Sequence, residues 1–111
     1  MLSTPSLHSI AYDVIEYCQT EFDIQSVYVI FSLNEDLDCW ATCEEDPDTA
    51  FKSYKIEVHP QQELRNFVAS LVHEMVHVKQ FVTNEWEGDG EQEALNLQYK
   101  ITDKIWKEGV I

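Results

Sequence analysis

The spacing of apolar residues divides the chain into amphipathic helices and a short β region between the first two. Apolar positions three or four residues apart predict helices over residues 5–20, 61–81 and 91–107. Thr4 and Pro5 suit the N-cap and the first position of the first helix. Residues 83–90 contain two glycines and interrupt the pattern, so the last two helices should form a hairpin.

The β region lies between residues 25 and 58. Residues 25–32 are rich in β-branched and aromatic side chains and predict a buried strand, which a polar turn from Asn34 to Asp38 ends. Cys39 to Cys43 form a second short candidate strand. After Phe51, apolar and polar residues alternate as far as Val58, the pattern of a strand with one buried face, and His59-Pro60 ends it.

This order of elements predicts an α+β fold. A chain of 111 residues, 44% of them hydrophobic, can bury one compact core but is too short for two domains, so residues 1–111 should form a single domain. We expect an N-terminal helix, a mostly antiparallel sheet of about three strands, and two C-terminal helices.

Charge restricts the partners that this protein can have. Seven Lys and Arg residues stand against 21 Asp and Glu residues, and the formal net charge of −14 disfavours nucleic acids and anionic membranes. A solvated acidic surface is one interpretation, and an acidic face that mimics DNA or attracts basic substrates is the other. The sequence shows no membrane-spanning run and no signal peptide, which predicts a soluble, cytoplasmic protein.

The three cysteines predict reduced thiols rather than a disulfide framework, because their number is odd and no signal peptide precedes them. In an extended segment, Cys39 and Cys43 would lie on the same face. Their spacing does not match the usual zinc motifs, so we expect a buried pair of small side chains there rather than a second metal site.

The stretch His73-Glu74-Met75-Val76-His77 is the strongest chemical signal in the chain. Histidines four residues apart on a helix differ by about 40° around its axis, so both imidazoles can reach one metal ion. The apolar stripe of this helix clusters around one direction, whereas the histidines lie about 180° and 220° from it. They are therefore not core histidines, although two solvated surface histidines remain the alternative.

A third ligand must come from another part of the chain, and the last helix offers Glu91 and Glu93. Glu91 falls within the apolar arc of that helix, while Glu93 lies about 200° from Glu91. A carboxylate at the edge of a buried face needs a partner, which makes Glu91 the first choice. A structural site would need a fourth protein ligand, for which the candidates are Glu85, Glu87 and Asp89.

The HExxH stretch, followed after a short loop by Glu91-Gln92-Glu93-Ala94, resembles the gluzincin class of zinc metallopeptidases. The short length and the element order are similar to minigluzincins and to small SprT-like and ImmA/IrrE-like peptidase domains. The resemblance implies a zincin-like domain in which His73, His77 and Glu91 bind Zn²⁺ and Glu74 is the general base. The SprT-like group typically uses a third histidine, and none follows His77 here, which favours the glutamate version.

The resemblance implies a zinc metalloendopeptidase that hydrolyses peptide or protein substrates, in which Glu74 takes a proton from the attacking water. Extended substrates of such enzymes commonly pair with a sheet edge, which either of the two later strands could supply. The enzyme could also be slow, or latent with its N-terminal segment over the cleft. The competing hypothesis is an acidic binding or inhibitor protein that keeps the scaffold without significant turnover.

The chain departs from the gluzincin pattern at one position. Many gluzincins carry Asp or Asn four residues after the ligand glutamate, where this chain has Leu95. The carboxylate that usually orients a ligand histidine is therefore missing or comes from another residue. A donor for the developing oxyanion is also expected, and the sequence does not rank the three candidates Tyr54, His59 and Tyr99.

Overall fold

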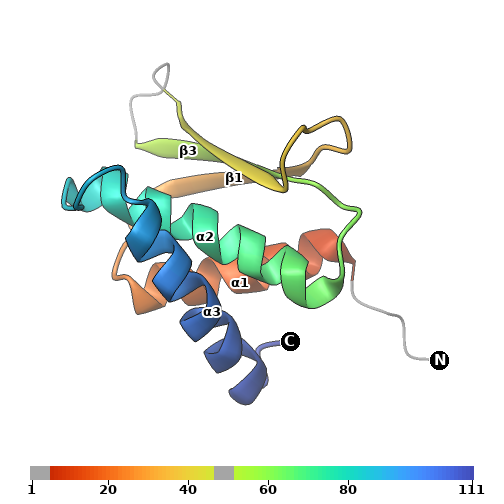
Figure 1. The fold of residues 1–111 in the computed structure, drawn as a ribbon. Helices are drawn as coiled ribbons and strands as arrows, with labels where there is room; N and C mark the ends of the chain where they lie inside the picture. The colour runs from red at the N-terminus through yellow and green to blue at the C-terminus, as the bar shows by residue number, and fades with distance from the viewer. Residues whose placement is uncertain (1–5, 47–51) are drawn as a thin grey trace.

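The computed structural model describes residues 6–46 and 52–111, and these form a three-stranded sheet with three helices on one side of it (Figure 1). The elements in chain order are α1 (Leu7–Glu21), β1 (Tyr28–Leu33), β2 (Ala41–Glu45), β3 (Ser53–Val58), α2 (Leu64–Thr83) and α3 (Glu91–Lys107). The predicted α+β class is confirmed, and α3 has the predicted bounds.

Helix α2 is the centre of the molecule. It contacts β2 and β3 on one side and α3 on the other, while α1 packs beside it and against β1 (Figure 1). The predicted apolar stripe of α2 comprises seven residues, and five of them are completely buried: Phe67, Val68, Leu71, Met75 and Val78. Of the other two, Leu64 is exposed and Val82 is half-buried. Because neighbouring elements pack against α2 on several sides, its buried side chains are held in defined positions.

The sheet is mixed, whereas a mostly antiparallel one was expected. The strand order is β1-β3-β2, in which β1 pairs parallel with β3 and β2 pairs antiparallel with β3. The three strands alternate in direction along the chain, so placing the last one in the middle makes one pair parallel. Sequence alternation indicates which face of a strand is buried, but it carries no information on strand order.

The prediction of a buried first strand holds for only one face of that strand. Strand β1 lies at one edge of the sheet, and its Phe31 is buried while Ile30 is 49% exposed. The apolar run from Val27 to Phe31 suggested that both faces are covered, but the described helices pack against only the Phe31 face.

Two helix starts differ from their predictions. Ser6 caps α1, with its side-chain oxygen accepting a hydrogen bond from the Ser9 N–H (3.1 Å), while Thr4 and Pro5 lie outside the described residues. Helix α2 begins at Leu64, three residues after the predicted start. The Gln62 side chain instead donates a hydrogen bond to the His59 carbonyl (2.8 Å), which stabilises a bend before the helix.

Cys39 and Cys43 do not form the predicted buried pair. Cys39 is exposed in the bend before β2, and Cys43 lies half-buried within the strand. The strand begins only at Ala41, so the two-residue alternation that would place both thiols on one face does not apply to Cys39. Burial, together with the negative charges of Glu74 and Glu44, raises the pKa of Cys43 to about 12.

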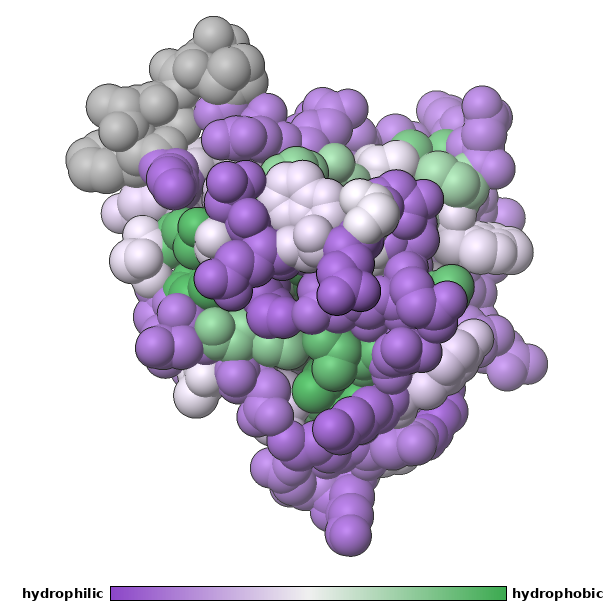
Figure 2. Space-filling model, turned by 60° about the vertical axis from the view of Figure 1, so that its left-hand side comes forward, coloured by the Kyte–Doolittle hydropathy of each residue, from purple (hydrophilic) through white to green (hydrophobic). Residues whose placement is uncertain are grey.

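The surface fits the acidic composition. Figure 2 shows a face on which hydrophilic residues cover most of the area and hydrophobic residues form limited patches between them. Within the described part of the chain, none of the helices is long and apolar enough to cross a lipid bilayer.

Two leucines on α2 provide a test of the core. Leu71 is completely buried, whereas Leu64, which the pattern places on the same stripe, is 40% exposed. We expect Leu71→Ala to lower the free energy of unfolding by about 2–5 kcal/mol, because it removes buried methyl groups and leaves a cavity. Leu64→Ala should cost no more than about 1 kcal/mol. Urea unfolding followed by circular dichroism measures both, and equal losses would contradict the described position of α2.

The thiols should differ in reactivity. Cys39 is exposed, whereas burial raises the pKa of both Cys18 and Cys43 and keeps these thiols protonated. We therefore expect one of the three cysteines to react rapidly with Ellman's reagent in the native protein and the other two only after unfolding. The rapid phase should disappear in Cys39→Ser, and a rapid phase that persists in this variant would refute the assignment.

Candidate metal centre

Helix α2 places two histidines side by side where it meets α3. His73 and His77 are one turn apart, their ring centroids are separated by 5.0 Å, and the rings meet edge to face. Their side chains are 17% and 16% exposed, so each is largely enclosed but still reachable. The histidines are partly buried because they lie at the contact between α2 and α3. The sequence alone indicated only that they lie off the apolar stripe of their helix.

The turn between α2 and α3 brings Glu91 to these histidines. Asn84 ends α2 in the left-handed conformation (φ 56°), and Gly90 precedes α3 with a φ of 80°. Glu91 is the first residue of α3. Its Oε2 lies 3.1 Å from His73 Nε2, and its Oε1 lies 2.8 Å from His77 Nε2.

His73, His77 and Glu91 form a cluster that could hold a metal ion. Their ligand atoms all lie within 4.8 Å of one another, and tetrahedral bonds of about 2.1 Å would place such atoms about 3.4 Å apart. At these distances an imidazole nitrogen and a carboxylate oxygen either share the N–H hydrogen of the ring in a hydrogen bond or both donate a lone pair to one metal ion. The donor set therefore fits a metal.

The other acidic residues near the hairpin do not join this cluster. Glu93 accepts hydrogen bonds from Lys79 Nζ (2.8 Å) and Gln80 Nε2 (3.0 Å), and these bonds, Lys79 first, lower the pKa of Glu93. Asp89 accepts a hydrogen bond from the Glu91 backbone N–H (3.0 Å). Among the described residues, the group that could hold a metal ion comprises His73, His77 and Glu91, so it has no fourth protein ligand.

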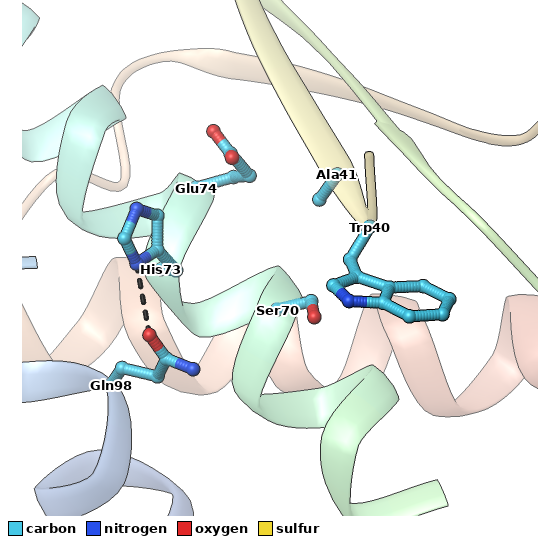
Figure 3. Close-up of a pocket in the computed structure, with 6 residues that line it drawn as sticks. All are labelled: Trp40, Ala41, Ser70, His73, Glu74 and Gln98. Atoms are coloured by element: carbon cyan, nitrogen blue, oxygen red, sulfur yellow. Dashed lines mark hydrogen bonds between the residues drawn. The ribbon is translucent and has the colours of Figure 1, made fainter. Parts of the chain in front are cut away.

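Glu74 lies beside the cluster and is only 8% exposed. Burial raises the pKa of this carboxyl group, while His77 and His73 oppose the shift. It borders a cavity of about 210 Å³ whose other lining residues are Trp40, Ala41, Ser70, His73 and Gln98. In Figure 3, the Glu74 carboxylate and the His73 ring lie on one side of this space, and Trp40 and Ala41 lie opposite them.

Two glutamines that the sequence analysis did not single out orient the histidines. Gln98 Oε1 lies 2.9 Å from His73 Nδ1 (Figure 3), and Gln80 Oε1 lies 2.9 Å from His77 Nδ1. The side chains that contact the outer nitrogens of the histidines are thus amides and not carboxylates, and Leu95 itself is exposed. Helical spacing is the sequence signal that could have identified both glutamines. Gln80 follows His77 by three residues, about one turn, and Gln98 follows Glu91 by seven residues, about two turns, so each lies on the same helix face as a residue of the cluster.

None of the three candidate oxyanion donors lines the cavity beside Glu74. Tyr54 is buried in β3, where its ring stacks on that of Phe81. Tyr99 and His59 border two neighbouring cavities, each of which shares Trp40 with the first. The Nδ1 atom of His59 accepts a hydrogen bond from the Gln61 backbone N–H (3.1 Å). Tyr99 and His59 are therefore near the site but not within it.

Comparison with known proteins adds no relative to these observations. No protein-family model matches the chain, and no curated protein sequence is significantly similar to it. The likeness to gluzincins therefore consists of the HExxH stretch and the glutamate on the following helix, and it does not show membership of that class.

Proposed function

We propose that this protein is a zinc-dependent peptidase whose metal ligands are His73, His77 and Glu91. The observation that carries this proposal is the combination of a three-donor cluster with the neighbouring cavity and the buried Glu74 carboxylate. A structural metal site would normally be closed by a fourth protein ligand, which the described residues do not supply. A catalytic site keeps that position open for water and substrate.

Zinc is the metal that we assign to this donor set. Two imidazoles and one carboxylate form an established set of ligands for catalytic zinc, whereas sites made only of oxygen ligands suit magnesium and calcium. When bound in such a site, zinc lowers the pKa of a coordinated water to about 7 and polarises a carbonyl group.

Glu74 is positioned to move the proton of the reaction. Its carboxylate borders the cavity in which an attacking water and a scissile amide would meet. In this proposal Glu74 accepts the proton of the water and then donates it to the leaving amine. The burial that raises its pKa also brings its proton affinity closer to that required of a base working near neutral pH.

Strand β2 is the element along which an extended peptide would bind. Of the two later strands, β3 is central in the sheet and paired on both sides, whereas β2 is at the edge. Its first residue, Ala41, lines the cavity beside Glu74. Main-chain pairing with β2 would therefore lead a substrate past the metal cluster. The N-terminal segment invoked for a latent form includes residues 1–5, which lie outside the described residues.

Metal analysis tests the ligand assignment. The protein purified without added zinc should contain about one zinc ion per chain. His73→Ala and Glu91→Gln should lose this ion because each removes one of three ligands, while the matched control Glu87→Gln, at an exposed carboxylate outside the cluster, should retain it. Zinc loss from Glu93→Gln but not from Glu91→Gln would show that the third ligand has been misassigned. A zinc-free wild-type protein that also takes up no added zinc would refute the metal site.

The Glu74→Gln variant tests turnover separately from metal binding. It should keep its zinc but lose about 10²- to 10⁴-fold in the rate of peptide cleavage, because an amide cannot accept the proton. Cleavage of labelled casein and of a pool of short peptides, with zinc content measured in parallel, gives both quantities. Unchanged cleavage in Glu74→Gln would remove this residue from the mechanism. Zinc binding without cleavage by the wild type would favour the competing function of a binding or inhibitor protein.

A further inference from the structure

The side chain of Gln80 is buried at the contact between α2 and α3, with only 4% of the residue exposed. Its Oε1 lies 2.9 Å from His77 Nδ1. Its Nε2 donates hydrogen bonds to the Gly90 carbonyl oxygen (2.9 Å) and to Glu93 Oε1 (3.0 Å). Both amide hydrogens and the amide oxygen are therefore in use, which is unusual for a side chain that ordinarily lies at the surface.

These contacts define the orientation of the amide. The two groups facing Nε2 are a carbonyl and a carboxylate, which can only accept hydrogen bonds. A flipped amide would place its oxygen against both of them and leave its nitrogen facing His77. The Oε1 atom must therefore face His77, and the His77 Nδ1 atom must carry a proton to donate to it.

We propose that Gln80 is a positioning residue that holds His77 in the tautomer protonated on Nδ1, with the Nε2 lone pair directed at the metal position. This inference rests on the metal site of the proposed function. A histidine binds metal through an unprotonated nitrogen, and a hydrogen bond from its other nitrogen sets both the tautomer and the ring orientation. Here a neutral amide, supported from α3, provides that hydrogen bond.

The surroundings of Gln80 show why the amide stays in place. Lys79, the preceding residue on α2, pairs with Glu93 Oε2 at 2.8 Å, while the other oxygen of that carboxylate accepts from Gln80. Gly90 permits the backbone to approach, since a Cβ atom there would lie 2.8 Å from Gln80 Cδ and 2.9 Å from Nε2. Glu93, the alternative ligand of the sequence analysis, thus has a role in holding Gln80.

Glutamine is the residue type that meets these demands. A glutamate at position 80 could accept a hydrogen bond from His77 Nδ1. Its second oxygen, however, would face the oxygens of the Gly90 carbonyl and the Glu93 carboxylate, to which it cannot donate. A methionine would fill a similar volume without any of the three hydrogen bonds. Because Gly90 directly precedes Glu91, Gln80 also links His77 to the turn that delivers the third ligand.

The zinc affinity of Gln80→Met and Gln80→Glu, measured by competition with a chromophoric chelator, tests this proposal. Both variants should bind zinc about 10- to 100-fold more weakly than the wild type. Gln92 is an exposed glutamine on α3, so Gln92→Met is the matched control and should leave the affinity unchanged. Thermal unfolding of the zinc-free proteins shows whether each variant is folded, and wild-type affinity in a folded Gln80→Met would overturn the proposal.

Long-range ¹H–¹⁵N NMR of the histidine rings provides a second measurement, which reads the tautomer of His77 directly. In the zinc-loaded wild type, His77 should show a protonated Nδ1 and a metal-bound Nε2, and the Nδ1 proton should exchange faster with solvent in Gln80→Met. Metal bound through Nδ1 would overturn the proposal even if zinc binding itself is tight. The two proposals can fail separately, because a wild type that binds zinc but cleaves no peptide would leave the role of Gln80 unaffected.

Discussion

The fold of the candidate site depends on the packing of the first turns of α3 against the second half of α2. The completely buried side chains of Val76 and Ala94 come from these two segments, and the small Ala94 permits a close approach. That approach sets the distance between Glu91 on one helix and the histidines on the other. Ala41 of strand β2 lines the opposite side of the cavity. The cavity therefore lies where α2 faces both β2 and α3.

The sequence predicted the features that depend on local periodicity. The bounds of α3, the buried face of β3 and the grouping of two histidines with a glutamate all follow from helical or strand spacing. It did not predict the parallel pairing of β1, because strand order depends on the packing of the whole domain. Gln98 was missed because it lies 25 residues from its partner His73, so that the pair leaves no pattern within one helix. Gln80 was missed although it follows His77 by three residues, because a glutamine at helical spacing ordinarily lies at the surface.

Orientation of the histidines by amides rather than carboxylates affects the charge of the site. Glu91 and Glu74 together carry two negative charges when ionised, which would balance one divalent cation. A carboxylate behind each histidine would add two further negative charges to a chain whose formal net charge is already −14. Glutamine supplies the same acceptor atom without this repulsion, and the amide hydrogens of Gln80 make additional contacts that a carboxylate could not.

The position of β3 between β1 and β2 has a consequence for the order of folding. The two edge strands precede the central strand in the chain, so during synthesis neither has its native partner until residue 58 has emerged. Residues 28 and 53, which pair at one end of β1, are separated by 25 positions, and closing such a loop slows folding relative to a hairpin. The metal centre is therefore completed only by the later half of the chain, and a nascent chain that stops before β3 exposes two unpaired strands.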